Sequence, residues 1–283
     1  MSNFSAAIKN VKYMLRQSRD VAAFGRKTVV RENVSNELLD TITPFRRISN
    51  KPTSLTDPKW FISKFEQETG SNFLPLNWTT MSEAEKVDHI VHRRYSKLVS
   101  NKIMNKIKDK DVEHLYSLDK DGEIIGFSSG VSDGVGQSII PGTRTTIHNH
   151  PNNWIPKSEI DAIGRPIAKE SHSYGDVSSS VINNIDSYVV DWQGSKFLLE
   201  PAQKFGGTSW NRSQIGTKMG LWVDMAADTN NTIEQVNLKL QKSSTLEEFA
   251  TTKFKEITGI FERQRAQIRE FADKGWCKFS ELT

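Results

Sequence analysis

The spacing of apolar residues along the chain is helical before residue 110, becomes that of strands, and is helical again from residue 245. Three early segments share an apolar side chain every three or four positions: 6–19, 59–68 and 82–107. This spacing predicts amphipathic helices. Ser82 and Glu85 form a capping-box pattern, which predicts that the third helix begins there. We therefore expect residues 1–110 to be mainly helical.

The pattern between residues 113 and 199 is typical of strands. A β-hairpin is predicted from three consecutive pieces: an alternating segment at 113–118, a turn at 119–122 and an apolar segment at 124–127. Further strands are predicted at 144–147, 188–192 and 196–199, and a short helix at 176–185. The segment 128–143 is rich in glycine and serine and predicts a loop, with a short strand at Ile139 and Ile140. This order of elements predicts an α/β fold with a mixed sheet and one crossover helix.

A long amphipathic helix is predicted over residues 245–274. Thr245 and Glu248 form a second capping-box pattern, a stripe of apolar residues follows, and Gly275 is the expected stop. The changes of pattern divide the chain into a basic helical region (1–110), a domain that holds the sheet (111–210) and a helical C-terminal region (211–283).

Composition narrows the chemistry that the chain can perform. The single cysteine, Cys277, excludes an internal disulfide and a zinc site built from several cysteines, so a metal site needs histidines and carboxylates. No segment contains the run of about 18 apolar residues that a membrane span needs. Residues 1–20 carry charges instead of the apolar stretch of a signal peptide. We expect a cytoplasmic protein.

Charge is distributed unevenly along the chain. Residues 1–110 hold 20 Lys and Arg against 11 Asp and Glu, whereas the remaining residues hold 18 against 23. The basic region fits contact with nucleic acid or with an acidic partner. A basic face that simply meets solvent is an equally good interpretation.

Two histidines lie one residue apart in the segment His148-Asn149-His150-Pro151, at the end of a predicted strand. Side chains at positions i and i+2 of a strand point to the same face, so both imidazoles can reach a single ion. The proline that follows removes a backbone donor and ends the strand. Metal ligation is therefore the favoured interpretation of this pair.

The motif and its surroundings resemble the JAMM/MPN family of metalloproteases, including its RadC-like and phage-encoded JAB relatives. In that family a glutamate on an early strand precedes His-x-His-Pro and then Ser-x-x-Asp, and the resemblance covers residues 112–201. It implies a JAB/MPN-like domain with one Zn²⁺ per chain held by His148 and His150. It also implies that Glu113 is the general base, with Glu123 as the other candidate.

Two Ser-x-x-Asp segments compete to supply the third ligand. Ser158 and Asp161 have the usual family spacing, but Pro166 soon follows and would break the helix expected to begin there. Ser173 and Asp176 lie further on and open the predicted helix, so they are the favoured pair. In that site the resemblance implies that Asp176 binds the metal and Ser173 stabilises an oxyanion. The ordinary role of such a serine is a helix N-cap, which is compatible.

These residues favour zinc-dependent hydrolysis of a peptide or isopeptide bond. By resemblance, the substrate is a protein or peptide, and ubiquitin-like proteins are one candidate class. A metal-dependent nuclease is an alternative, because His-Asn-His accompanies a basic region. A non-catalytic phage or mobile-element assembly or interaction protein with a JAB-like fold is a second alternative, which zinc content would distinguish.

Overall fold

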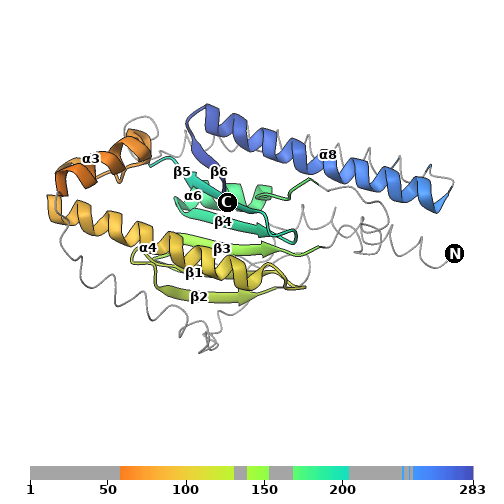
Figure 1. Cartoon of the computed structure of the whole chain (residues 1–283), viewed down its shortest axis with the longest axis horizontal. Helices are drawn as coiled ribbons and strands as arrows, with labels where there is room; N and C mark the ends of the chain where they lie inside the picture. The colour runs from red at the N-terminus through yellow and green to blue at the C-terminus, as the bar shows by residue number, and fades with distance from the viewer. Residues whose placement is uncertain are drawn as a thin grey trace.

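The computed structural model describes residues 58–130, 139–152, 168–203 and 245–282, together with Leu238 and Lys242. Its centre is a six-stranded mixed sheet with helices on both faces (Figure 1). The strands are β1 (His114–Leu118), β2 (Ile124–Ser129), β3 (Thr145–His150), β4 (Asp186–Asp191), β5 (Lys196–Pro201) and β6 (Cys277–Leu282). The helices are α3 (Pro58–Thr69), α4 (Glu83–Ile107), α6 (Tyr174–Asn183) and α8 (Leu246–Asp273), with short 3₁₀ turns at Ser71–Phe73 and Trp78–Thr80.

The strand order is β2-β1-β3-β4-β5-β6, and every neighbouring pair is antiparallel except β3 and β4. Two parallel neighbours need a crossover connection, and α6 lies between them in the chain. The α/β fold with a mixed sheet and a crossover helix is therefore confirmed. The succession of the first five strands and α6 along the chain also follows the sequence prediction, which did not extend to the order of strands within the sheet.

Strand β6 is a correction to the sequence prediction, which ends the chain with the long helix. It pairs antiparallel with β5 along its whole length. Cys277 is buried, and Phe279 stacks on Phe197 with 5.8 Å between ring centroids. Within this segment only Cys277 and Phe279 follow the alternation of a strand, and Glu281 interrupts it, so the pattern does not mark a strand. Conversely, Ile139 and Ile140 lie outside any strand.

Helix α4 covers one face of the sheet. The capping box at its start is formed, because the Ser82 side chain accepts from the Glu85 amide and the Glu85 side chain accepts from the Ser82 amide. The apolar stripe of α4 packs on residues of β1, β3, β4 and β5 in one core cluster: Tyr95, Val99, Ile103, Met104, Ile107, Tyr116, Leu118, Ile147, Tyr188, Val190 and Leu198. This cluster joins the predicted helical region to the sheet.

Helices α6 and α8 cover the opposite face (Figure 1). Their core cluster consists of Val177, Leu199, Ile268, Phe271 and Cys277. Helix α8 begins after Thr245, whose side chain accepts from the Glu248 amide, and the chain turns at Gly275 with a φ of 72°. None of the described helices is both long and apolar enough to cross a membrane. The predicted helix at 6–19 and residues 204–237 lie outside the described residues.

A buried ion cluster fastens α4 to the sheet at the end where β4 begins. Arg93 contacts Glu200 directly and lies 4.0 Å from Asp186. Burial raises the pKa of Asp186 to about 6. Burial would also raise the pKa of Glu200, but the charge of Arg93 lowers it below its ordinary value. Arg93 is thus the close cation that offsets one buried carboxyl group, that of Glu200, and one half-buried carboxyl group, that of Asp186.

Ile103→Ala should lower the free energy of unfolding by about 2–5 kcal/mol, the usual cost of emptying a fully buried aliphatic site. Ile103 has no exposed surface and packs between α4 and the sheet. Leu98→Ala on the same helix is the matched control, because the Leu98 side chain is 51% exposed. Urea denaturation of both variants measures the difference. Equal effects would contradict the packing of α4 on the sheet.

Candidate metal centre

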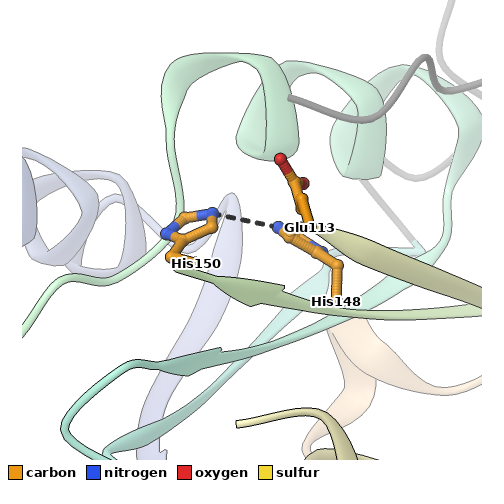
Figure 2. A group of neighbouring side chains, drawn as sticks. All are labelled: Glu113, His148 and His150. Atoms are coloured by element: carbon orange, nitrogen blue, oxygen red, sulfur yellow. Dashed lines mark hydrogen bonds between the residues drawn. The ribbon is translucent and has the colours of Figure 1, made fainter. Parts of the chain in front are cut away.

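The two histidines of the motif lie at the C-terminal end of β3, a strand paired on one side with β1 and on the other with β4. His148 has no exposed surface, and the side chain of His150 is 11% exposed. Their Nε2 atoms are 3.2 Å apart (Figure 2). The expectation that both imidazoles face one point is confirmed, because the strand alternation places them together on the α6 side of the sheet.

Asp176 lies directly opposite the two histidines, in the first turn of α6. Its Oδ1 is 3.1 Å from Nε2 of His148, and its Oδ2 is 3.4 Å from Nε2 of His150. The carboxylate is oriented by a capping box, in which the Ser173 amide donates to Oδ2 at 2.7 Å and the Asp176 amide donates to the Ser173 hydroxyl at 3.3 Å. The helix start therefore aims this carboxylate at the histidines.

The electrostatics of this cluster favour a cation. Burial alone would lower the pKa of His150, but its hydrogen bond to Asp176 and the negative charges of Glu170, Asp176 and Glu113 raise the pKa to about 10. Burial alone would raise the pKa of Asp176, but His148 and His150 hold it well below its ordinary value. A positive charge between these groups is therefore strongly stabilised.

The spacing of the donor atoms also fits a metal ion. Two ligands of a tetrahedral zinc, each about 2.0–2.1 Å from the ion, lie about 3.3–3.4 Å apart. The separations among the two Nε2 atoms and the Asp176 oxygens are 3.1, 3.2 and 3.4 Å. Glu113, His148 and His150 also form a group whose ligand atoms lie within 4.8 Å of one another, so this group could hold a metal ion.

Glu113 reaches the site from the residue that precedes β1 (Figure 2). Its backbone carbonyl accepts a hydrogen bond from the Gly130 amide at 2.8 Å, which ties it to the end of β2. Glu123, the other candidate base, lies beyond the opposite end of β1, where its amide donates to Asp119 in the hairpin turn. The structure thus brings Glu113, and not Glu123, to the histidines.

The two Ser-x-x-Asp segments differ in what the structure describes. Ser158 and Asp161 fall within 153–167, outside the described residues. Ser173 is the N-cap of α6, as its ordinary role predicts, and it lies three residues before Asp176 in the capping box. Its hydroxyl oxygen accepts from the helix amide, and this leaves the hydroxyl hydrogen for another acceptor.

Several groups around the site were not expected to contribute. Glu170 Oε1 lies 3.7 Å from Nδ1 of His150, and the Glu170 amide donates to Asp191 at 3.1 Å. Asp191 is fully buried at the end of β4 and also accepts from Ser195. The sequence around Glu170 contains no pattern that indicates a role in the site. Its contacts with His150 and Asp191 join residues that are about 20 positions away along the chain.

His172 is fully buried next to Ser173, the N-cap of α6. Its Nε2 lies 2.8 Å from the Ser187 carbonyl, which fits a neutral ring whose Nε2 donates. Burial lowers the pKa of His172 to about 4. This hydrogen bond therefore links the residue before the N-cap of α6 to β4.

Comparisons of the chain with protein-family models, curated proteins and solved structures found no match.

Proposed function

We propose that the chain is a zinc-dependent hydrolase that cleaves a peptide or isopeptide bond, in the manner of the JAMM/MPN proteins that its motif resembles. The observation that supports this most directly is the convergence of two imidazoles and one carboxylate at tetrahedral spacing, with a second carboxylate close by. Hydrolytic zinc sites typically combine three protein ligands, an open position and a base.

In this proposal His148, His150 and Asp176 hold the zinc ion. Zinc bound there would polarise the carbonyl under attack and lower the pKa of a water molecule. The Ser173 amide keeps Oδ2 of Asp176 turned toward the histidines. Glu170 lies beside Nδ1 of His150, where a carboxylate favours the tautomer that leaves Nε2 free to bind a metal.

Glu113 acts as the general base in this scheme. Its carboxylate lies within the same 4.8 Å group as the two histidines, so it can take a proton from a water molecule placed between them. A carboxylate that acts as general base has to be ionised and to lie close to the water molecule, but it is not itself a metal ligand.

Ser173 assists the reaction by donating its hydroxyl hydrogen to the developing oxyanion. The oxygen of this hydroxyl already accepts from the Asp176 amide, which fixes its position at the helix start. A donor held in place before the reaction stabilises the developing charge without having to reorganise. A ubiquitin-like protein is one substrate class that the resemblance suggests. The excess of Lys and Arg before residue 110 would suit an acidic partner or nucleic acid.

Zinc content tests the ligand set without a known substrate. Elemental mass spectrometry of the purified wild-type protein should find about one zinc per chain. Asp176→Ala should lose the zinc and Asp161→Ala should retain it. Loss in Asp161→Ala alone would assign the third ligand to that residue. A wild-type protein that takes up no zinc would contradict the hydrolase proposal and favour a non-catalytic interaction protein.

Substrate assays test the reaction itself. Fluorogenic peptides and isopeptide-linked ubiquitin-like conjugates should be cleaved by the zinc-loaded protein and not by His148→Ala. Double- and single-stranded DNA serve as the competing substrates. DNA cleavage that His148→Ala abolishes, without any peptide cleavage, would replace the proposal with the nuclease alternative.

A further inference from the structure

Asn149, the residue between the two histidines, has a side chain that points away from the metal site. Strand alternation places it on the α4 side of the sheet, the side on which Ile147 joins the α4 core cluster. Asn149 has no exposed surface. A buried amide has to satisfy its donors and acceptor within the protein, so its partners report what it holds.

The partners of Asn149 are backbone groups on both sides of Glu113. Its Oδ1 accepts from the His114 amide at 2.7 Å, and its Nδ2 donates to the Val112 carbonyl at 3.1 Å. A longer contact of 3.4 Å joins Nδ2 to the Lys110 carbonyl. The side chain therefore clamps the peptide groups that precede and follow the proposed base.

The side-chain hydrogen bonds of Asn149 take the place of backbone hydrogen bonds between β1 and β3, because the regular pairing of these two strands stops one residue before Asn149. Strands β1 and β3 pair from Leu118 opposite Thr145 to Leu115 opposite His148. The next position would place His114 opposite Asn149, and there the His114 amide bonds to the Asn149 side chain instead. The chain can thus leave the regular ladder at Glu113 and still be held in a fixed position.

We infer that Asn149 is a positioning residue for Glu113, and that it sets the place of this carboxylate relative to the two histidines. The inference rests on the proposed function, because it gives Glu113 a working role beside a bound metal. Asn149 is covalently joined to both histidines and hydrogen-bonded to both neighbours of Glu113. The Gly130 amide holds the Glu113 carbonyl from the other side. One amide therefore couples the base to the metal-binding strand.

The test uses the cobalt-substituted protein, whose visible spectrum changes with pH when groups near the metal exchange protons. Asn149→Asp keeps the size and the acceptor for the His114 amide but replaces the donor to Val112 with an oxygen. We expect it to bind cobalt and zinc at the wild-type stoichiometry, because His148 and His150 are unchanged. The midpoint is the pH at which the change in the cobalt spectrum is half complete. In Asn149→Asp this midpoint should shift from the wild-type value in the same direction as in Glu113→Gln.

The decisive comparison is the double variant Asn149→Ser with Glu113→Gln, because serine at this position adds no charge beside the two histidines. Its midpoint should equal that of Glu113→Gln alone, because Asn149 acts only through Glu113. Asn184→Asp is the matched control, since the Asn184 amide donates to Gln203 at the far end of α6, and its midpoint should equal that of the wild type. Asn149→Ser removes both the bond from the His114 amide and the bond to the Val112 carbonyl without adding charge, and it also serves alone if Asn149→Asp does not fold.

The outcomes separate this inference from the proposed function. If the Glu113→Gln midpoint shifts but both folded Asn149 variants keep the wild-type midpoint, the positioning role is wrong and the hydrolase proposal stands. Additive shifts in the double variant would also overturn it. A wild-type protein that binds neither cobalt nor zinc would overturn the proposed function, and the role of Asn149 with it.

Discussion

Glu113→Gln will retain the bound zinc and lower the rate of hydrolysis by roughly 10²- to 10⁴-fold, the usual contribution of a general base. Glutamine preserves the size of the side chain and the backbone bond to Gly130, but it cannot take up a proton at neutral pH. Because the proton moves only as the reaction proceeds, kcat should fall while KM stays nearly constant. Steady-state kinetics on a cleaved peptide or isopeptide, with zinc content measured in parallel, checks both parts.

Glu123→Gln is the matched control for this prediction. Glu123 was the competing candidate in the sequence, and the structure places it in the hairpin turn at the other end of β1. Its replacement should leave kcat and zinc content unchanged. Loss of zinc in Glu113→Gln would show that Glu113 binds the metal instead of activating water, and an unchanged rate would remove it from the reaction altogether.

Arg93→Met will lower the free energy of unfolding by about 3–5 kcal/mol, the range found when one partner of a buried ion pair is removed. The side chains of Arg93 and Glu200 are 18% and 9% exposed, so solvent screens them little. Methionine fills much of the same volume but leaves Glu200 and Asp186 without their closest cation. Urea denaturation followed by circular dichroism measures the loss.

Lys97→Met provides the control within the same cluster. Lys97 lies 3.9 Å from Glu200, but its side chain is 49% exposed. Exposed ion pairs contribute only about 0–1 kcal/mol, so this variant should unfold nearly as the wild type does. A similar loss of unfolding free energy in both variants would show that the number of positive charges near Glu200 matters, and not the burial of Arg93. No loss in Arg93→Met would show that the two carboxyl groups accept protons at little cost.

The two predictions concern charged groups at opposite ends of the parallel pair β3 and β4. The Arg93 cluster lies where these strands begin, and the two histidines lie where β3 ends. The first holds the helix on the sheet, whereas the second faces the start of α6. A stability change in Arg93 variants with an unchanged zinc content would therefore be the expected pattern.

Much of the site could be predicted from local sequence. His148 and His150 are expected on the same face of the strand because side chains alternate between the two faces of every strand. The helix start at Ser173 follows from its capping pattern. The position of Asp176 beside the histidines could be proposed but not decided, because the length of the intervening segment says nothing about where the chain returns. The sequence also left open whether Glu113 or Glu123 is the general base. The structure places Glu113 at the end of β1 that lies near the histidines and Glu123 beyond the other end.

Other parts of the site had no sequence signal of their own. Asn149 lies inside the motif, yet its function depends on the partners of its amide, which belong to the chain around Glu113. Glu170 lies beside His150 while its amide donates to Asp191, at the end of β4. Such contacts join residues that are distant in sequence, and hydrophobic periodicity reports only on neighbours along the chain.

The sequence by itself determined the kinds of most elements, the succession of the first five strands along the chain and the fact that the two histidines share one face of β3, because periodicity and capping are local properties. Only the tertiary structure decided the pairing of β6 with β5, the approach of Asp176 and Glu113 to the histidines, and the burial of Arg93 between two carboxyl groups. These features arise when separate elements pack together, and the free energy of their contacts depends on burial and distance that no single segment specifies.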